Sequence, residues 1–476
     1  MNILYVEGDN EYLGFIKDVV EKMPNINKIN IFQSKTDAIY FTKRNLIDIF
    51  VISFDGLAVD AGGNLSVDES MNFFRHVISD FAFTPVIFLS SSNMSIDIIN
   101  YLLSESHHMD IWGDGVSSPT IKVFAKDDMN NLSAELTELS NSVNQVNGMA
   151  IDSGGKQLSL TPEQKRILKV FTRQFKGVSC HVKKLDGGLS QSRVLQIRVD
   201  DINGASRIHA VAKLNNIKNI DIESLNYSQE ISRLPVRAYA PQVGIVKGGA
   251  SNSAGVFYRL LKLDDLSLFQ LLEKDKVTAS KVVVNLMGLL TSWHDDRPRA
   301  NVSIESIRQE MVSDEDVSIL SEKFDLPWIQ DVERIKVNSC TCSIHGDLHG
   351  ENVFVSNNNE PVMIDFGDVR EGPSVFDPIT LELSLFTHPS TKESIEWLPD
   401  LSNSTWADLD TYLVDCPYSD FIRACRNWSH EVAGGDQAVN AGAYSYLLRQ
   451  LKYTDVDHEL ILDLLTTVKE SILDPE

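Results

Sequence analysis

Residues 343–369 read SIHGDLHGENVFVSNNNEPVMIDFGDV and predict a β-hairpin with polar side chains at its open end. The apolar runs VFV and VMI are typical of strands, and the serine and asparagines between them are typical of a turn. Asp347, Asn352 and Asp365 flank these strands, so the hairpin is expected to bring two carboxylates and one amide together. Such hard oxygen ligands suit Mg²⁺, which completes its shell with water and phosphate oxygens.

The same residues resemble two motifs of the aminoglycoside phosphotransferase and choline kinase-like branch of the protein-kinase-like superfamily. That branch carries H-G-D-x-x-x-x-N, followed by I-D-[FW]-[GE]. Here HGDLHGEN begins at His345 and IDFG begins at Ile364, and every motif position is filled. The resemblance implies that Asp347 accepts the proton of an attacking hydroxyl, and that Asn352 and Asp365 hold Mg²⁺. It also implies an α+β bilobal domain with a helical C-terminal lobe.

Length and charge limit the possible classes of protein. A chain of 476 residues is expected to form two or three domains. It has 43 basic and 67 acidic residues, a net charge of −24, which argues against a general nucleic-acid surface. The sequence has no apolar run of about 18 residues and no basic segment ahead of an apolar one, so we expect neither a membrane span nor a signal peptide.

The five cysteines are expected to be reduced thiols in a cytoplasmic protein. Their number is odd and their spacing fits no zinc template. Cys340 and Cys342 alternate on a segment expected to be a strand, where core packing is a better explanation than redox chemistry.

Residues 1–146 alternate apolar runs with helix-like segments, which predicts a doubly wound parallel sheet. The expected strands are Ile3–Val6, Ile29–Phe32, Ile47–Ile52, Pro85–Leu89 and Ile121–Phe124. The expected helices are 10–23, 35–45, 67–81, 95–106 and 129–145. Five such units favour a flavodoxin-like five-stranded domain, and their arrangement resembles the receiver domain of response regulators.

The landmarks of the receiver family are only partly present. The acidic pair after the first strand is represented by Glu7, with Gly8 in place of the second acid and Asp9 next. Aligning the third strand puts Ser53 at the phosphoacceptor position, with Asp55 two residues later. The switch hydroxyl and the lysine of the family are matched by Ser90 and Lys126.

A serine cannot form an acyl phosphate, and the loss of one acid weakens Mg²⁺ binding. We therefore expect a degenerate receiver-like domain that keeps the fold and serves as a docking or dimerisation surface. The alternative is a shifted phosphorylation site built from Asp55, Glu7 and Asp9.

The segment 147–158 is polar, contains glycines and lacks periodicity, so it is expected to be a linker. A helix is predicted to begin after Thr161, with Pro162 in its first turn and Gln164 completing a capping box. The kinase-like domain is expected to span 159–476, with its N-terminal lobe at about 159–262 and its C-terminal lobe at about 263–476.

A glycine turn between two predicted strands is the expected nucleotide loop. Glycines allow close approach of the backbone to phosphates, and hydroxyls can donate to phosphate oxygens. The loop resembles the L-x-G-G-x-S/T stretch of the phosphotransferase family, which implies ATP contacts from Gly187, Gly188 and Ser190.

Lys213 lies on the predicted strand Ile208–Lys213, where kinase-like folds keep the lysine that contacts the α- and β-phosphates. Two carboxylates of the following predicted helix, Asp221–Leu234, are candidates for its ion-pair partner. Glu230 is preferred over Glu223 because of its distance from Lys213 and its expected place in the helix.

The sequence thus predicts an ATP- and Mg²⁺-dependent phosphotransferase that acts on a hydroxyl of an unidentified acceptor. Asp377 is expected to anchor the metal loop, the segment that carries the IDFG motif. His349 is expected to orient Asp347 or the backbone. The alternatives are a nucleotide-binding scaffold without turnover and a kinase that acts on a protein. A protein partner or a second copy of the chain is expected at the receiver-like domain.

Overall fold

The structure is a computed structural model that describes residues 1–10, 12–13, 28–58, 65–91, 95–155, 158–184, 193–260, 266–295, 297–356, 358–391, 395, 397–402 and 406–474. The chain forms two compact units. The first consists of Met1–Leu185, Ser190–Ile220 and Gln242–Arg259, and the second of Asp186–Leu189, Asp221–Pro241 and Leu260–Glu476.

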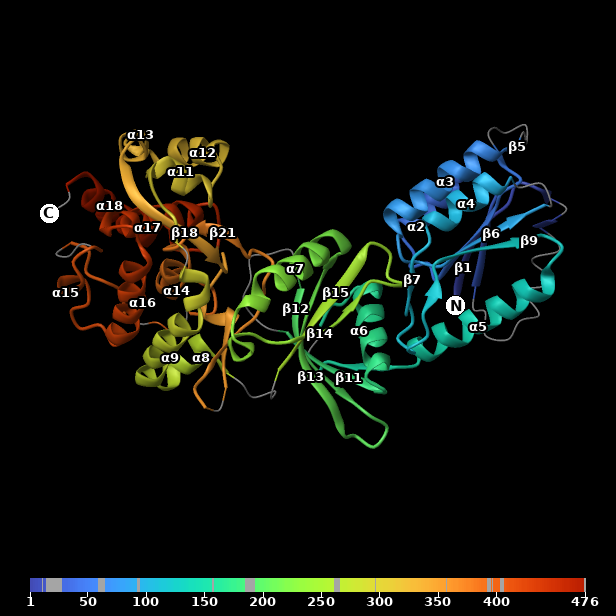
Figure 1. The fold of residues 1–476 in the computed structure, drawn as a ribbon, viewed down its shortest axis with the longest axis horizontal. Helices are drawn as coiled ribbons and strands as arrows, with labels where there is room; N and C mark the ends of the chain where they lie inside the picture. Colours follow the sequence, from blue (N-terminus) through green and yellow to red (C-terminus); the bar gives the residue numbers. More distant parts are fainter. Residues whose placement is uncertain are drawn as a thin grey trace. The chain divides into compact units, whose positions relative to one another are not determined.

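The first unit begins with a five-stranded parallel sheet in the order β2-β1-β3-β6-β9 (Figure 1). Its strands are β1 (Asn2–Val6), β2 (Lys28–Phe32), β3 (Ile49–Ser53), β6 (Val86–Ser90) and β9 (Ile121–Ala125). All five match the predicted apolar runs, so the predicted sheet is confirmed. Two short pairs complete this part, β4 (Leu57–Ala58) with β5 (Leu65–Ser66) and β7 (His108–Met109) with β8 (Ser118–Pro119).

Alternating side chains of these strands bury two faces of the sheet. Leu4 and Phe50 belong to a cluster with residues of α2 (Lys35–Thr42), α3 (Val67–Asp80) and α4 (Ile96–Ser104). Ile3 and Ile49, one residue earlier on each strand, belong to a cluster with residues of α5 (Met129–Asn147). This period-2 pattern explains why the strands are apolar along their whole length. Most of the helix predicted at 10–23 lies outside the described residues.

A six-stranded sheet follows, in the order β10-β11-β12-β13-β15-β14. Its strands are β10 (Ala150–Asp152), β11 (Ser179–Lys184), β12 (Arg193–Asp200), β13 (Ser206–Asn216), β14 (Gln242–Val246) and β15 (Ser253–Arg259). The pairs are antiparallel except for β10 with β11. Helix α6 (Pro162–Gln174) packs on this sheet, and its predicted capping box between Thr161 and Gln164 is present.

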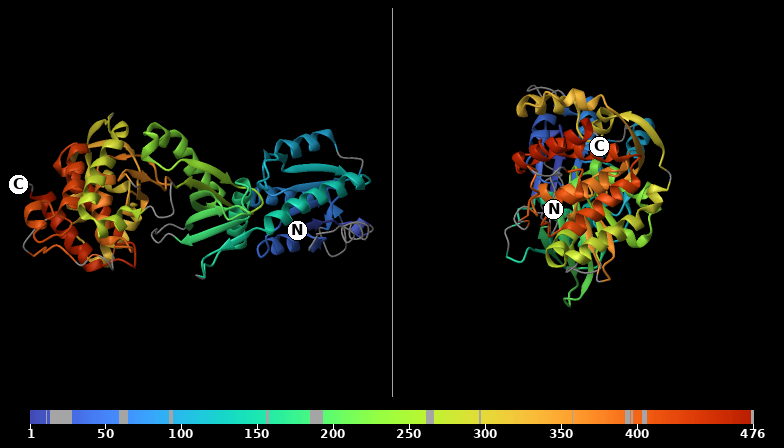
Figure 2. Two further views of the ribbon diagram at one scale, coloured as in Figure 1. Left: turned by 90° about the horizontal axis from the view of Figure 1, so that it is seen from below. Right: turned by 90° about the vertical axis from the view of Figure 1, so that its left-hand side faces the viewer.

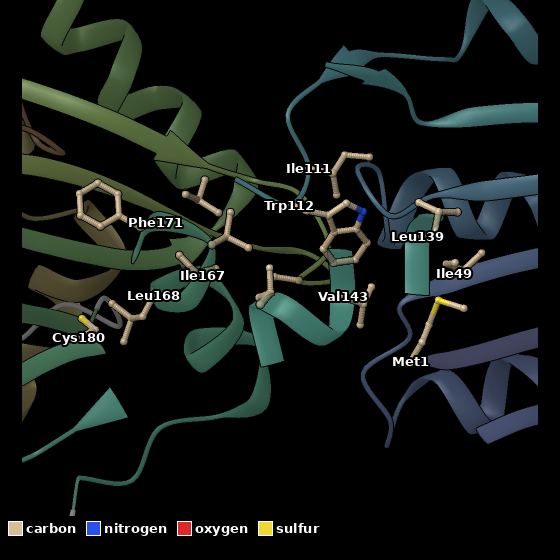
Figure 3. Close-up of a cluster of buried hydrophobic side chains, with 14 of the residues drawn as sticks. Met1, Ile49, Ile111, Trp112, Leu139, Val143, Ile167, Leu168, Phe171 and Cys180 are labelled. Atoms are coloured by element: carbon tan, nitrogen blue, oxygen red, sulfur yellow. The ribbon is translucent and has the colours of Figure 1, made fainter. Parts of the chain in front are cut away.

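The segment predicted to be a linker contributes to this sheet. Within it, β10 pairs with β11, so the chain passes from α5 into the six-stranded sheet without a long free connection. One hydrophobic cluster extends from the parallel sheet to the six-stranded sheet. Figure 3 shows the ring of Trp112 between Leu139 and Val143 of α5 and Ile167 of α6. Side chains of the parallel sheet and of the six-stranded sheet therefore belong to one hydrophobic cluster.

The second unit is mainly helical (Figure 2). Within it, α14 packs against both α16 and α17. Its helices are α8 (Leu268–Lys274), α9 (Lys276–Leu289), α10 (Thr291–His294), α11 (Ile304–Gln309), α12 (Asp314–Phe324), α13 (Ile329–Glu333), α14 (Phe376–Thr387), α15 (Leu409–Tyr412), α16 (Ser419–Val432), α17 (Asp436–Gln450) and α18 (His458–Leu473). Helix α7 (Ile217–Gln229) begins in the first unit and ends in the second.

Short strands and 3₁₀ turns connect these helices. They are β16 (Leu266–Ser267), β17 (Arg299–Ser303), β18 (Lys336–Ile344), β19 (Val353–Val355), β20 (Pro361–Met363), β21 (Arg370–Pro373), η1 (Ile231–Arg233), η2 (Val236–Ala238) and η3 (Gly350–Asn352). The predicted fold class, a parallel α/β sheet followed by an α+β region with a helical C-terminal part, is confirmed. All five cysteines are unpaired and buried. Among the described residues, no helix has both the length and the apolar character needed to cross a bilayer.

Candidate active site

The predicted hairpin is formed by β19 and β20, which pair in antiparallel register with Val353 opposite Met363. The amide N–H of Ile364 donates to the carbonyl oxygen of Asn352 at 3.0 Å and extends this pairing toward the open end. Asn352 ends η3 and directly precedes β19, whereas Asp365 follows β20 by two residues. The hairpin therefore brings the backbones of the two motifs together at its open end.

The Asn352 amide is oriented by two hydrogen bonds from its nitrogen. Nδ2 donates to the carbonyl oxygen of Asp347 at 2.8 Å and lies 3.2 Å from Nε2 of His349. Because both contacts use the nitrogen, the amide oxygen is the atom that Asn352 offers to a cation. A carboxamide oxygen and a nearby carboxylate suit Mg²⁺, which binds few protein ligands and keeps water or phosphate oxygens. The residues therefore fit the predicted magnesium site.

His349 is buried beside this amide. Burial lowers the pKa of His349 to about 4, so the imidazole is neutral near pH 7 and its Nε2 can accept a hydrogen bond. The same nitrogen lies 3.7 Å from Oδ2 of Asp347. His349 therefore orients the Asn352 amide.

Positive φ angles at two residues shape the two motif loops. Gly346 has a φ of +81°, and a Cβ atom there would lie 2.4 Å from the carbonyl oxygen of Asp368. Asp365 adopts a φ of +66° without being glycine, a strained conformation that the surrounding structure must hold. His345 Nε2 lies 2.9 Å from the carbonyl oxygen of Ile364. The catalytic loop, which carries the HGDLHGEN motif, and the metal loop thus touch through the His345 ring and the Ile364 carbonyl group.

Asp377 holds the catalytic loop by its backbone. Its two carboxylate oxygens accept hydrogen bonds from the N–H groups of His345 at 2.8 Å and Gly346 at 3.0 Å. Burial raises the pKa of Asp377. The prediction that Asp377 anchors the metal loop was therefore wrong about its target, which is the loop that precedes Asp347. The antiparallel pairing puts Ile344 at the end of β18 opposite Arg370, and the chain after β21 lies beside Cys340, where the Ser374 N–H donates to the Cys340 carbonyl oxygen. Asp377 follows in the first turn of α14 and reaches the catalytic loop from there.

Arg449 reaches Asp347 from the last turn of α17, and sequence reasoning missed it. Its Nη2 lies 3.6 Å from Oδ1 of Asp347. The two residues are about 100 positions apart in the chain, and no motif points to Arg449. A second missed residue is Asn226 of α7, whose Nδ2 donates to the carbonyl oxygens of Phe366 and Gly367 at 3.5 and 3.3 Å.

Lys213 lies on β13, a central strand, where it is opposite Val194 on one neighbour and Val256 on the other. Its side chain is 7% exposed, which sets it apart from a solvated strand lysine. The predicted phosphate-binding residues Gly187, Gly188 and Ser190 lie outside the described residues.

The two glutamates considered as partners of Lys213 differ in burial and position. Glu230 follows the end of α7 rather than lying within it, and its Oε2 accepts hydrogen bonds from Ser343 and Arg233, both at 2.8 Å. Glu223 lies within α7 and is 1% exposed. One of the two reasons for preferring Glu230, its expected place in the helix, was therefore wrong, because α7 ends one residue before it.

The receiver-like sheet carries a second group of charged residues at the ends of its strands. Nζ of Lys126 lies 2.7 Å from Asp55 and 2.8 Å from Glu7. Asp55 also accepts from the Ser91 hydroxyl at 2.8 Å and from the Ser91 N–H at 3.1 Å. Although burial opposes ionisation, the hydrogen bonds from Lys126 and Ser91 lower the pKa of Asp55 below its ordinary value.

This arrangement differs from the alignment made from the sequence. The side chain of Ser53, assigned there to the phosphoacceptor position, is fully buried. The carboxylate that meets the lysine is Asp55, and the hydroxyl beside it belongs to Ser91 rather than to Ser90. Asp55 lies two residues after Ser53, the last residue of β3, and strand alignment alone did not show that Asp55 is the carboxylate that contacts Lys126.

Comparison with known proteins found one matching family model and several similar solved structures. Residues 291–398 match the model of the phosphotransferase enzyme family, and this stretch contains both motifs. The complex of gentamicin with APH(2")-IIa has a TM-score of 0.37, 13% identity, and coverage of 67% of this chain and 98% of that one. A glucosamine kinase bound to glucosamine, ADP and inorganic phosphate has a TM-score of 0.29, 10% identity, and coverage of 62% and 94%.

The signal receiver domain of a protein from Vibrio parahaemolyticus, assigned as a LuxO repressor, has a TM-score of 0.22 and 16% identity. That likeness covers 31% of this chain and 97% of the receiver domain. No curated protein matches the chain at a significant level. The resemblance recognised from the HGDLHGEN and IDFG motifs is confirmed, since the region from 291 to 398 carries the sequence pattern of the phosphotransferase enzyme family.

Proposed function

We propose that the chain is a kinase that transfers the γ-phosphoryl group of ATP to a hydroxyl of an acceptor, with Mg²⁺ as cofactor. The observation that carries this proposal is the arrangement at the open end of the hairpin. Asn352 Nδ2 is fixed on the carbonyl oxygen of Asp347, and the strand pairing brings Asp365 to the same end. The family match over 291–398 supports phosphoryl transfer as the reaction class.

Each residue of this arrangement has a distinct role in the proposal. Asn352 and Asp365 would hold Mg²⁺, which when bound neutralises charge on the phosphate oxygens. Asp347, which is 33% exposed, accepts the proton of the acceptor hydroxyl. Asp377 keeps the backbone ahead of Asp347 in place. Positioning and charge neutralisation therefore account for most of the expected catalysis.

The nucleotide-binding residues remain part of the proposal. Lys213 is assigned to the ATP phosphates, together with Gly187, Gly188 and Ser190. Glu230 and Glu223 both remain candidates for the partner of Lys213. The Glu230 carboxylate accepts hydrogen bonds from Ser343 and Arg233, and Glu223 is 1% exposed. We retain 159–262 and 263–476 as the proposed lobes, and the cytoplasm as the proposed location.

The direct test is release of ADP by purified protein in the presence of Mg²⁺ and candidate acceptors. Asp347→Asn is expected to lower kcat by roughly 10²–10⁴, the usual contribution of a positioned general base, while ATP still binds. Unchanged turnover in Asp347→Asn would remove the assignment. Binding of MgATP without turnover in the wild type would favour the nucleotide-binding scaffold, and mass spectrometry of modified proteins would identify a protein acceptor.

A second function is favoured by the charged group in the receiver-like domain. Asp55, Lys126, Ser91 and Glu7 form one hydrogen-bonded set, which supports the shifted phosphorylation site rather than a degenerate one. The Asp55 carboxylate is 25% exposed and therefore open to a small phosphodonor. In this proposal, the receiver-like domain takes up a phosphoryl group and remains the docking site for a protein partner or a second copy of the chain.

A further inference from the structure

The guanidinium of Arg449 lies where the acceptor of the proposed reaction must approach. If Asp347 takes the proton of the acceptor hydroxyl, the hydroxyl oxygen must come within about 3 Å of a carboxylate oxygen of Asp347. One of these oxygens, Oδ1, is 3.6 Å from Nη2 of Arg449. Any group one or two bonds away from the reacting hydroxyl is therefore within reach of Arg449.

We propose that the acceptor is an anionic alcohol, carrying a phosphate or a carboxylate close to the reacting hydroxyl, and that Arg449 binds this anion. The inference rests on the proposed kinase function and adds the chemical class of the acceptor. Arginine suits the role because its planar fork of N–H donors matches the oxygens of a carboxylate or a phosphate.

The separation between Arg449 and Asp347 leaves this pairing incomplete. A contact of 3.6 Å is longer than a charge-assisted hydrogen bond, which has a length of about 2.7–2.9 Å. The Arg449 side chain is 24% exposed and Asp347 is 33% exposed, so both remain open to a ligand. When an acceptor hydroxyl engages Asp347, the guanidinium has N–H groups to offer to a second part of the same molecule.

The helix that carries Arg449 is held firmly by its neighbours. Tyr446, one turn earlier on α17, has its hydroxyl 2.8 Å from the Thr387 hydroxyl of α14, and both side chains are buried. Two residues before that, the hydroxyl of Tyr444 donates to Oε1 of Glu333 at 3.2 Å. A charge presented from a fixed helix discriminates between ligands because it does not move away from an unsuitable one.

In the proposed step, the acceptor hydroxyl oxygen forms a bond to the γ-phosphorus of ATP. The bond between that phosphorus and the β–γ bridging oxygen breaks, ADP leaves, and the hydroxyl proton passes to Asp347. Arg449 takes no part in these bond changes. It binds the acceptor through its anion and disfavours cationic acceptors, since two positive charges would meet next to Asp347.

The test compares matched acceptors in the ADP-release assay with the full chain. The probes are glycerol 3-phosphate and glycerate as anionic alcohols, glycerol as the neutral alcohol of the same size, and a polycationic aminocyclitol. The expected result is ADP release with the anionic probes, or competitive slowing of the basal ATPase by them, and no effect of the cation. Arg449→Gln is expected to raise the KM or inhibition constant of the anion by about tenfold or more, while kcat stays within a few-fold.

Two further variants separate recognition from structure. Arg449→Lys keeps the charge and is expected to recover part of the affinity, whereas Arg449→Glu is expected to abolish the effect of the anions. Arg423→Gln is the matched control, because Arg423 forms an exposed ion pair of 3.0 Å with Asp410 on the same unit. A fall in kcat with unchanged KM in Arg449→Gln would show that Arg449 only positions Asp347, and would overturn the inference.

The remaining outcomes distinguish the two levels of the proposal. ATP hydrolysis that responds to glycerol or the cation but ignores both anions overturns the anionic acceptor and leaves the kinase function standing. A protein that neither binds MgATP in a thermal-shift assay nor releases ADP overturns the kinase function, and the inference about the acceptor with it.

Discussion

Arg166 of α6 forms a buried ion pair with Asp48, the residue before β3, with 2.7 Å between Nη2 and Oδ1. The same guanidinium donates to the carbonyl oxygen of Gly249 and lies 5.4 Å from the centre of the Trp112 ring. One side chain thus links the parallel sheet, the β7–β8 segment and the six-stranded sheet. The receiver-like domain and the proposed nucleotide lobe are therefore in direct side-chain contact at Arg166.

Removing the Arg166 charge should destabilise the first unit strongly. We expect Arg166→Leu to lower the free energy of unfolding by about 3–5 kcal/mol, because Asp48 is left as a buried charge without its partner. Denaturant unfolding followed by circular dichroism measures this change. Arg173→Leu is the matched control, since Arg173 pairs with the partly exposed Asp114 at 3.2 Å and should matter less. Equal losses in the two variants would contradict the importance of the buried pair.

Gly249 allows close contact between the two sheets of the first unit. It has a φ of +66°, and a Cβ there would lie 2.9 Å from the Trp112 ring. Gly249→Ala should therefore cause both a steric clash with the Trp112 ring and backbone strain. Gly115→Ala isolates the strain, because Gly115 has a φ of +82° and open space around it. We expect a loss of about 1–2 kcal/mol for Gly115→Ala and a larger one for Gly249→Ala, measured by thermal unfolding. The reverse order would argue against close packing here.

Truncation of Asp377 should loosen the catalytic loop. Asp377→Ala leaves the N–H groups of His345 and Gly346 without their acceptor. We expect this to lower the free energy of unfolding by about 1–3 kcal/mol for each buried donor. Asp377→Asn keeps one acceptor oxygen and should be intermediate. The exposed cap Asp408 provides a control, because Asp408→Ala removes a helix cap worth about 1 kcal/mol. Calorimetric unfolding that ranks Asp408→Ala as the more damaging change would refute the anchoring role.

Magnesium should be required for stabilisation by ATP. At an ATP concentration of about 100 times Kd, MgATP is expected to stabilise the wild type by roughly 2.7 kcal/mol, and removal of the metal with a chelator should abolish the effect. Asn352→Ala and Asp365→Ala should lose this stabilisation in a thermal-shift assay. Asn301→Ala, which removes an exposed amide that bonds to Asn338, should keep it. Full stabilisation of Asn352→Ala by MgATP would place the metal elsewhere.

Phosphorylation of the receiver-like domain can be tested with acetyl phosphate and Mg²⁺. The contacts of Asp55 with Lys126 and Ser91 predict one base-labile phosphoryl group on intact protein by mass spectrometry. Asp55→Asn should abolish this modification, whereas Ser53→Ala should leave it unchanged, because the Ser53 side chain is fully buried. Absence of the modification in the wild type would show that the receiver-like domain is degenerate and does not accept a phosphoryl group.

Local sequence patterns were sufficient for much of the fold. The five strands of the parallel sheet, the capping box at Thr161 and the β19–β20 hairpin were all predicted, because each depends on residues within a few positions of one another. The two motifs likewise identified Asp347, Asn352 and Asp365 as candidates. Their proximity follows from the shortness of the hairpin, which leaves the chain few alternatives.

Features that depend on distant parts of the chain could not be predicted in this way. Periodicity overestimated the helix that was expected to contain Glu230, since α7 ends at Gln229. The alignment of β3 put Ser53 at the phosphoacceptor position, whereas in the fold Asp55 is the residue that contacts Lys126. The polarity of 147–158 indicated a linker, and only pairing with β11 shows that β10 lies within it.

By itself, the sequence determined the chemistry available at the hairpin, because motif spacing and strand pairing are local properties. The tertiary structure alone decided which charges surround that chemistry, with Asp377 on the catalytic loop and Arg449 beside Asp347. It also decided which distant charges pair elsewhere, as Arg166 does with Asp48. The physical reason is that an ion pair between distant residues leaves no periodic trace in a sequence. It exists only when the packing of whole helices and sheets brings the two side chains within a few ångströms of each other.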